Sequence, residues 1–587
     1  MTSAPANLPV FVIFASNSQV GNAVNISSPV LMISPTSPAT WNDFGHNFDV
    51  TTLLRRSNGR LVHLNLKIMF EGGGDTSQRL TSALASSSSG MINASDLPLP
   101  FCSLMPTVEE YAGLVTELGF ELAVSVLRAA GDAALAREEG TDAERLALID
   151  SVPFHVAMLR RNEAYTAFRR GARYLRPEPL PDVSDAARSF ALSASLPCAL
   201  NAYSVVFDFE ADPFGRDRLA VLIGSNGTGK TQILLSIING LRHPRPESEA
   251  TPAARFVHAA SGGFRFGPPA LARVVVFSST LSDIYHQSLP PWQNIDYAFY
   301  STIEPRSSAS DVLTQSFVDC LRDDRRGLFR TQAGDPNNQM IFPGASRQDL
   351  LRTMLGPLNV WSRLYLPLRA GADQDFPSLV SSDGRFYFSI DSYRALNEER
   401  QLRLIHFIDT TFAPVVFNDA IGPRRLSSGE TVLMRFCAQA VASVEKGSLF
   451  LFDEPETHLH PQFISYFAKL LHILLQSTGS IAIIATHSAY LVREVPSRRV
   501  RVLSFDAERQ IQILYPRMQT FGASIDAISD SVFFDSTTDH LYMSTLRAWF
   551  ASQSPEGVDE IVESAGEGMN PESLSYLASL ARGTGRI

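Results

Sequence analysis

The chain of 587 residues is long enough for roughly four folding units, which excludes a single small module. Hydrophobic residues make up 45% of it and charged residues 19%, a composition typical of a folded globular protein and not of a disordered or fibrous one. The formal net charge of −10 argues against a surface covered all over by nucleic acid, although it allows a local basic patch.

Cysteine spacing and the start of the chain limit the compartment. The four cysteines stand far apart, without a C-x-x-C pair, so the sequence predicts neither a disulfide framework nor a zinc site. The apolar stretch from Pro9 to Ala15 lacks the positive flank of a signal peptide, because the first basic residue is Arg55. No window approaches 18 uninterrupted apolar residues. We therefore expect a cytoplasmic protein without a membrane partner.

The first hundred residues form a predicted β-rich N-terminal region, 1–100. Short apolar runs at 10–15 and 30–34 predict strands, and the runs on either side of Asn58-Gly59 predict a tight hairpin. Residues 72–89 are rich in glycine and serine and are interpreted as a linker within this region.

A predicted helical region follows at 101–195. Thr107 stands as an N-cap before Glu109 and Glu110, apolar residues recur at helical spacing as far as Leu135, and a second helical stretch covers 142–174. The arginines of this stretch are interleaved with aromatic residues, which makes a phosphate-backbone contact surface one interpretation. A solvated helix face is the simpler interpretation of such a charge run. The arginines are Arg160, Arg161, Arg169, Arg170, Arg173 and Arg176.

Strand and helix patterns alternate from about residue 200, which favours an α/β fold with a parallel sheet covered on both faces. The interval between 310 and 410 loses this alternation, becomes charged and is interpreted as a helical insertion. The predicted divisions of this part are 196–310, 311–410, 411–515 and a C-terminal helical region at 516–587.

A phosphate-binding loop is predicted directly after the apolar run Leu219 to Ile223, where the sequence fits G-x-x-x-x-G-K-[ST] and opens a helix. Glycines there let successive backbone N–H groups point at phosphate oxygens, Lys230 would contact the β and γ phosphates of ATP, and Thr231 would contact Mg²⁺. The candidate nucleotide-binding residues of this loop are Gly224, Ser225, Asn226, Gly227, Thr228, Gly229, Lys230, Thr231 and Gln232.

Two adjacent carboxylates end the apolar run Ser448 to Phe452. Asp453 is the candidate second Mg²⁺ contact and Glu454 the candidate base that polarises attacking water. An acidic pair after a strand is also a common turn, so it gains its meaning from the phosphate loop. A second predicted anion cradle lies at Ser427, Ser428 and Gly429, where hydroxyls and N–H groups open a helix; alone this is only a capping motif.

These motifs together resemble an ABC-type ATPase. L-S-S-G-E ahead of L-F-L-F-D-E-P is similar to that class's signature and Walker B motifs, and His487, after the run Ile481 to Ala485, matches its switch histidine. The resemblance implies an ABC-type head with a parallel-sheet core, and a homodimer in which Ser428 and Gly429 of one copy contact the γ-phosphate held by Lys230 of the other. It also implies catalytic roles for Glu454 and His487.

The stretch D-E-P-E-T-H-L-H-P at 453–461 is similar to the RecF, OLD and SMC-like ATPases, often called AAA ATPases in bacteria. The resemblance puts Glu456 to His460 in a loop that touches the opposing head. Weaker likenesses at 41–45 and 520–525 point to ATPases of Septu-type and retron-associated anti-phage systems. The chain departs from the class in having no glutamine soon after the strand at 273–277, since Gln287 comes late.

The leading hypothesis is a Mg²⁺-dependent ATPase that dimerises around ATP and regulates or senses for a separate effector, a nuclease or toxin, in bacterial anti-phage defence. The alternative is a DNA-repair or chromosome-maintenance ATPase that binds DNA directly through the arginine-rich stretch. A third hypothesis is a nucleotide-locked scaffold that turns over slowly.

Overall fold

The computed structural model describes residues 7–16, 28–36, 45–97, 99–178, 183, 185–195, 201–210, 218–242, 255–260, 263–266, 268–279, 284–290, 293, 295–302, 311–323, 329–332, 341–372, 376, 379–380, 384–418, 422–506, 508, 510–533, 541–553 and 569–581. Residues 41–44 of the weak likeness at 41–45 lie outside this set. Among the described residues, no helix combines the length and the apolar character needed to cross a membrane.

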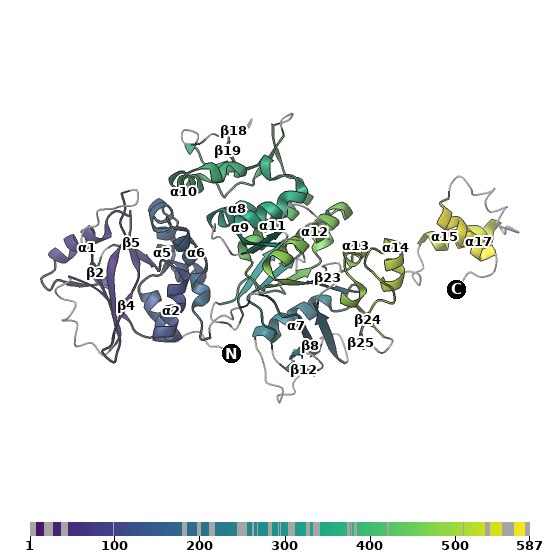
Figure 1. Cartoon of the computed structure of the whole chain (residues 1–587), viewed down its shortest axis with the longest axis horizontal. Helices are drawn as coiled ribbons and strands as arrows, with labels where there is room; N and C mark the ends of the chain where they lie inside the picture. The colour runs from purple at the N-terminus through teal and green to yellow at the C-terminus, as the bar shows by residue number, and fades with distance from the viewer. Residues whose placement is uncertain are drawn as a thin grey trace.

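The N-terminal part contains a five-stranded sheet in the order β4-β3-β2-β1-β6 (Figure 1). The predicted strands and hairpin are confirmed, with Gly59 at φ +80° in the turn between β3 and β4. The second hairpin run divides, because β5 leaves this sheet and pairs with β7. These strands are β1 Phe11–Ala15, β2 Val30–Pro35, β3 Val50–Arg55, β4 Leu61–Leu64, β5 Lys67–Phe70, β6 Met91–Asn93 and β7 Phe101–Leu104.

The interpretation of residues 72–89 as a linker is wrong. They contain helix α1, Thr76–Ala85, which begins where the Asp75 side chain accepts a hydrogen bond from the N–H of Gln78. Leu80 and Leu84, four residues apart, are both buried on one face of the helix. The cap and this apolar pair outweigh the high glycine and serine content of the flanks.

Five α-helices follow where two helical stretches were predicted, and glycines at φ +81° (Gly119) and +69° (Gly131) interrupt the first of these stretches. Buried residues of the strands and of these helices form one hydrophobic core that runs from Val12 to Leu175, so the predicted boundary at residue 100 does not separate two cores. We call residues 7–178 the N-terminal domain. Its helices are α2 Val108–Leu118, α3 Phe120–Ala129, α4 Ala133–Glu139, α5 Ala143–Ile149 and α6 Asn162–Arg170.

A seven-stranded sheet forms the centre of the molecule, in the order β14-β13-β22-β23-β10-β24-β25. All neighbouring pairs are parallel except β24 with β25, which confirms the predicted α/β fold with a parallel-sheet core. The strands are β10 Leu219–Ile223, β13 Val274–Ser278, β14 Tyr297–Ser301, β22 Leu449–Asp453, β23 Ile481–Thr486, β24 Val500–Phe505 and β25 Ile511–Leu514.

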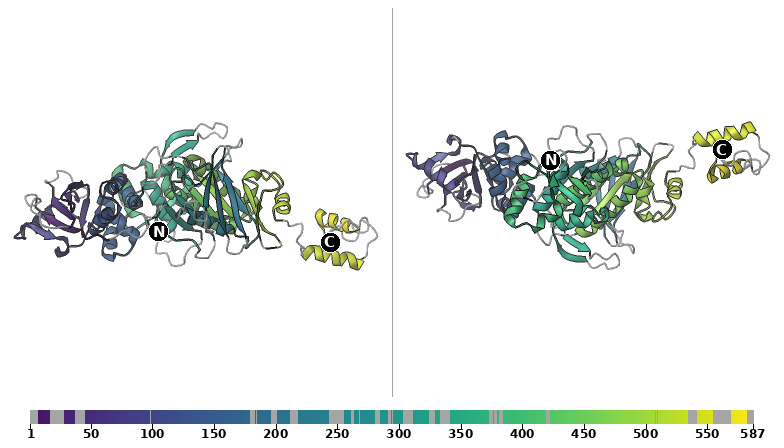
Figure 2. Two further views of the ribbon diagram at one scale, coloured as in Figure 1. Left: turned by 90° about the horizontal axis from the view of Figure 1, so that it is seen from below. Right: turned by 90° about the horizontal axis from the view of Figure 1, so that it is seen from above.

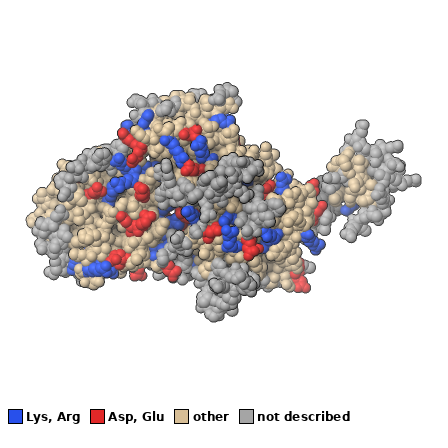
Figure 3. All heavy atoms as spheres, viewed as in Figure 1, with Lys and Arg blue, Asp and Glu red and all other residues tan. Residues whose placement is uncertain are grey.

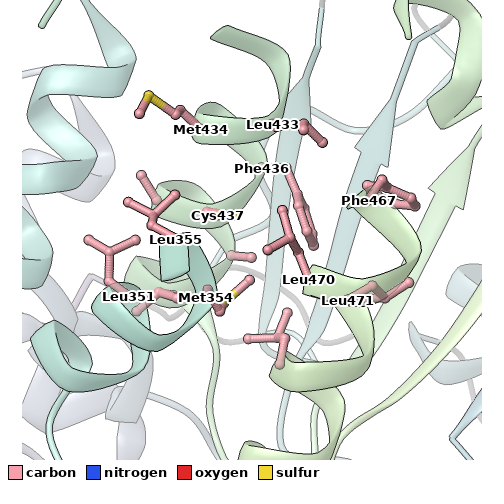
Figure 4. Close-up of a cluster of buried hydrophobic side chains, with 14 of the residues drawn as sticks. Leu351, Met354, Leu355, Leu433, Met434, Phe436, Cys437, Phe467, Leu470 and Leu471 are labelled. Atoms are coloured by element: carbon pink, nitrogen blue, oxygen red, sulfur yellow. The ribbon is translucent and has the colours of Figure 1, made fainter. Parts of the chain in front are cut away.

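Alternate residues of the central strands face two separate cores, as the period of two in a strand requires. In β22, Phe450 and Phe452 pack on one face while Leu449 and Leu451 pack on the other. The core that contains Phe450 and Phe452 lies against α9, α11 and α12 (Figure 4). The core that contains Leu449 and Leu451, on the other face of the sheet, is covered by α7. These helices are α7 Lys230–Arg242, α9 Arg347–Leu355, α11 Ser428–Ser443 and α12 Pro461–Thr478.

The predicted helical insertion at 311–410 is only partly helical. Helices α8 Val312–Arg322 and α9 share the core of the sheet, whereas β17 Leu364–Leu368 and β19 Phe386–Ser389 belong to an antiparallel sheet. The charged surroundings obscured these short strands, whose own residues are apolar and aromatic. Near the C-terminus, α15 Leu541–Gln553 and α17 Pro571–Ala581 pack on each other through Leu546 and Leu577 (Figures 1 and 2).

Candidate functional site

The phosphate loop joins β10 to α7, as the sequence predicts. Gly227 and Gly229 have φ of +81° and +90°, backbone conformations that L side chains rarely adopt. A Cβ at Gly224 would lie 2.4 Å from the carbonyl oxygen of Leu503, so only glycine fits there. Lys230 Nζ donates to the carbonyl oxygens of Gly224 and Ser225 at 2.9 and 3.1 Å. Its ammonium therefore lies within the loop that would surround a phosphate.

Thr231 and Asp453 meet beside this loop. The Thr231 hydroxyl donates to Asp453 Oδ1 at 3.0 Å, and Asp453 is completely buried at the end of β22. Burial raises the pKa of the Asp453 carboxyl to about 6, although hydrogen bonds from Thr231 and Tyr285 oppose that rise. Hydroxyl and carboxylate oxygens are the ligands that Mg²⁺ prefers, so the two predicted metal-binding residues fit that ion chemically.

Glu454 follows directly and adopts a left-handed backbone conformation, with φ 51° and ψ 52°. Among the described non-glycine residues, only Asn359 shares a positive φ. Such a conformation costs on the order of 1–3 kcal/mol and is found preferentially at functional sites. The backbone N–H of Glu454 donates to Ala485 O at 2.8 Å, which fixes the turn against β23.

His487 lies next to the predicted base. Its Nδ1 is 3.6 Å from Glu454 Oε1 and 3.8 Å from Glu456 Oε1. The Glu456 carboxylate accepts hydrogen bonds from the Thr486 hydroxyl at 2.5 Å and from the backbone N–H of His487 at 2.9 Å. The resemblance put Glu456 in a loop that touches an opposing head, but its side chain is buried within its own chain. It holds the segment that presents His487.

The signature residues begin α11. Ser427 is the N-cap and forms a capping box with Glu430, which Arg424 also binds through two hydrogen bonds of 2.8 Å. These bonds lower the pKa of Glu430 to about 2, mainly through Arg424. Ser427 and Ser428 are exposed, and Gly429 is buried where a Cβ would lie 2.7 Å from the ring of Phe463. These contacts fix the start of α11, while Ser427 and Ser428 face the solvent.

Tyr285 is a site residue that the sequence interpretation did not assign. Its hydroxyl donates to Asp453 Oδ2 at 3.0 Å, and its ring stacks on Phe299 with centroids 5.9 Å apart. Tyr285 lies in the segment after β13, where the class has a glutamine. Thr280 and Asp283 of this segment are outside the described residues. A single tyrosine in such a segment matches no sequence motif. Only the hydrogen bond to Asp453 in the folded chain indicates that Tyr285 supports this carboxylate.

Three residues of the arginine-rich stretch lie neither on a solvated helix face nor on an open phosphate-binding surface, whereas Arg161 is exposed. Arg169 pairs with Asp319, and Arg170 and Arg173 contact Glu445 at 2.5 and 2.8 Å. Both acidic partners belong to the central part of the chain, so the arginines join it to the N-terminal domain. The face drawn in Figure 3 shows acidic and basic side chains interspersed over its described part.

The central part of the chain has the fold of an ABC-type P-loop ATPase head. Its phosphate loop, acidic pair and switch histidine follow three adjacent parallel strands, β10, β22 and β23, at their carboxyl ends. All three elements are where the sequence predicts them.

Comparisons with known proteins found a matching family profile, a phage relative and solved structures of low overall similarity. The family profile described as "AAA domain, putative AbiEii toxin, Type IV TA system" matches residues 361–493. Protein ea59 of Escherichia phage lambda is 25% identical over 458 residues, which cover 76% of this chain and 77% of that protein. Among solved structures, the SMC head domain from Thermotoga maritima has 11% identity and a TM-score of 0.28, covering 57% of this chain and 100% of that one. UvrA2 from Deinococcus radiodurans has 13% identity and a TM-score of 0.27, covering 57% and 37%.

Proposed function

We propose that this protein binds ATP with Mg²⁺ and hydrolyses it at a site completed by a second copy of the chain, and that the cycle regulates a separate effector protein. The observation that carries the proposal is the convergence of Thr231, Asp453, Glu454 and His487 beside the phosphate loop. Each role in ATP hydrolysis needs a different group, and these four supply them within one edge of the sheet.

The proposed roles combine this geometry with the resemblance to ABC-type ATPases. Backbone N–H groups of the loop and Lys230 would bind the phosphates, while Thr231 and Asp453 would hold Mg²⁺, which supplies charge neutralisation there. Glu454 accepts a proton from attacking water, and His487, 3.6 Å from it, contacts the γ-phosphate. The buried Glu456 carboxylate accepts a hydrogen bond from the backbone N–H of His487 and so keeps this residue oriented.

The exposure of the phosphate loop and of the start of α11 supports a site shared by two copies of the chain. Ser225 and Asn226 of the phosphate loop are open to solvent, as are Ser427 and Ser428 at the start of α11. One chain carries one of each cradle, so two copies facing each other would bury two nucleotides. ATP then stabilises the closed dimer because it contacts both subunits only in that state.

The effector is a proposal supported by the chain's chemistry and by its relatives. The described residues hold no group of three or more His, Cys, Asp or Glu side chains arranged to bind a metal ion, so a metal nuclease centre has no candidate there. The matching family profile carries a toxin–antitoxin description, and a relative occurs in a phage. Both favour a role in anti-phage defence. The rival DNA-binding hypothesis loses part of its residue basis, because Arg169, Arg170 and Arg173 make internal ion pairs, whereas Arg161 of the same stretch is exposed.

The test is ATP turnover and ATP-dependent dimerisation of the wild type, Glu454→Gln and Lys230→Ala. We expect Glu454→Gln to retain ATP and accumulate as a dimer, and Lys230→Ala to bind no ATP. Wild-type turnover by Glu454→Gln would show that Glu454 is not the base. Negligible turnover by the wild type with tight ATP binding would favour the slow scaffold.

The partner is sought by purifying tagged Glu454→Gln protein from its native host with ATP present. Recovery of a nuclease or toxin in near-equal amount supports the effector hypothesis. Recovery of nucleic acid alone, together with ATP hydrolysis stimulated by duplex DNA and steeply weakened by salt, would favour the repair-type alternative.

A further inference from the structure

A cavity of about 240 Å³ lies where the N-terminal domain meets the ATPase head. Helices α4 and α6 and the turn after α6 line one side, and α8, β14 and the end of α11 line the other. Six arginines and four carboxylates surround it, so the lining carries two excess positive charges. The arginines are Arg137, Arg169, Arg170, Arg173, Arg176 and Arg273.

Four of these arginines pair with carboxylates on other elements of the chain. Arg169 pairs with Asp319, and Arg170 contacts Glu445 at 2.5 Å. Arg173 and Arg273 share Asp296, at 2.6 and 3.6 Å. These ion pairs have a structural role, because each of them joins two elements that are distant in the sequence.

Arg176 and Arg137 are not balanced in this way. Arg176 is 4% exposed and donates to the backbone carbonyls of Arg173 and Gln293 at 2.7 and 3.1 Å; no carboxylate of the described residues forms an ion pair with it. Arg137 donates to Arg169 O at 2.7 Å, and its acidic neighbour Glu138 is 3.7 Å away and 38% exposed. Burial lowers the pKa of each guanidinium to about 10.

Unused hydrogen-bond donors surround the same space. Within the described part of the chain, the Nε atoms of Arg137, Arg173 and Arg273 are buried without an acceptor. A buried donor without a partner costs on the order of 1–3 kcal/mol, and more when it is charged. The cavity is polar, carries excess positive charge and has N–H donors without an acceptor. It is therefore suited to an anion that accepts several hydrogen bonds.

We propose that this cavity binds a small anion carrying a phosphate group, such as inorganic phosphate, pyrophosphate or the phosphate of a mononucleotide. A doubly charged phosphate matches the two excess charges of the lining. Its oxygens can accept from several guanidinium groups at once, in the fork geometry that arginine offers. The volume lies below the roughly 300–1,000 Å³ of pockets for drug-sized ligands, which favours a compact anion.

Binding is tested by calorimetry on the full-length Lys230→Ala protein, which weakens the phosphate loop as a competing site. Phosphate, pyrophosphate and AMP are titrated separately at constant ionic strength. Arg137→Gln is then added, and Arg60→Gln serves as the matched control because it removes the same charge from an exposed ion pair with Glu117 in the same domain. Circular dichroism and thermal unfolding verify that each variant is folded.

We expect at least one of the three anions to bind, Arg137→Gln to weaken it by about tenfold or more, and Arg60→Gln to leave it unchanged. Which anion binds identifies the source of the phosphate. The proposal is overturned if none binds, or if Arg137→Gln and Arg60→Gln behave alike. Should Arg137→Gln not fold, hydrogen exchange decides: the anion must protect residues 162–176 of the Lys230→Ala protein, and unchanged exchange there overturns the proposal.

Discussion

Tyr285 offers a sharp test of the metal site. Among the described residues, its hydroxyl is one of two side-chain donors to Asp453, the other being that of Thr231, and both distances are 3.0 Å. Tyr285→Phe removes the hydroxyl and keeps the ring, which is 4% exposed and stacks on Phe299. The fold should therefore survive while the Asp453 carboxylate loses half of its side-chain support.

The expected magnitude follows from that lost bond. A hydrogen bond to a charged group contributes about 1.5–3 kcal/mol, and removing a residue that orients a metal ligand typically costs about 10–100-fold in metal affinity or activity. Burial already raises the pKa of Asp453 to about 6, and loss of a donor to its charged form raises it further. We expect the Mg²⁺ concentration that half-saturates ATP turnover to rise about 10–100-fold.

The assay measures ATP turnover against Mg²⁺ concentration for wild type, Tyr285→Phe and Tyr297→Phe. Tyr297 is the matched control, because its exposed hydroxyl bonds to the carbonyl oxygen of His286 at 2.9 Å and not to the site. Equal Mg²⁺ dependence in wild type and Tyr285→Phe would refute the view that Tyr285 supports the metal ligand. A change of the same size in Tyr297→Phe would refute its specificity.

Three further variants test other parts of the head. Ser428→Arg should leave ATP binding by the monomer intact and prevent hydrolysis, measured by equilibrium dialysis and phosphate release; lost binding would argue against a composite site. Gly429→Ala should lower turnover and thermal stability, since its Cβ would lie 2.7 Å from the Phe463 ring; an unchanged unfolding midpoint would show that the ring moves aside at little cost. Glu445→Gln should destabilise the protein by about 3 kcal/mol in denaturant titrations at pH 7. Burial raises the Glu445 pKa, but Arg170 and its neighbours lower it more, to well below the ordinary 4.5, so its stabilisation is complete above pH 4.5 and declines as the pH falls below it. Glu445→Gln should flatten that acid decline, and an identical decline would contradict the assignment.

The sequence predicts the arrangement of the candidate site well because each motif there is local. The phosphate loop needs glycines at fixed offsets and a helix that starts at Lys230, and both can be recognised without knowing the rest of the fold. The acidic pair and His487 each follow an apolar run that has the length of a buried strand. Parallel pairing then brings the strand ends together.

Long-range pairings were not predictable in the same way. The contact between Tyr285 and Asp453 joins residues 168 positions apart, and that between Arg173 and Glu445 spans 272 positions. A basic run looks the same in sequence whether it faces water, a phosphate backbone or buried carboxylates. Its partners decide its role, and these lie on elements that only the folded chain brings together.

The position of Glu445 gives those arginines a consequence for the ATPase. Glu445 lies in the short connection between α11, which begins with the signature, and β22, which ends in Asp453. Arg170 and Arg173 of the N-terminal domain reach this connection, and Arg347 reaches it from the head. A shift of the N-terminal domain would therefore act on the connection between the candidate signature helix and the strand that ends in Asp453. Because Arg170 and Arg173 also line the interdomain cavity, an anion bound there would compete with Glu445 for them.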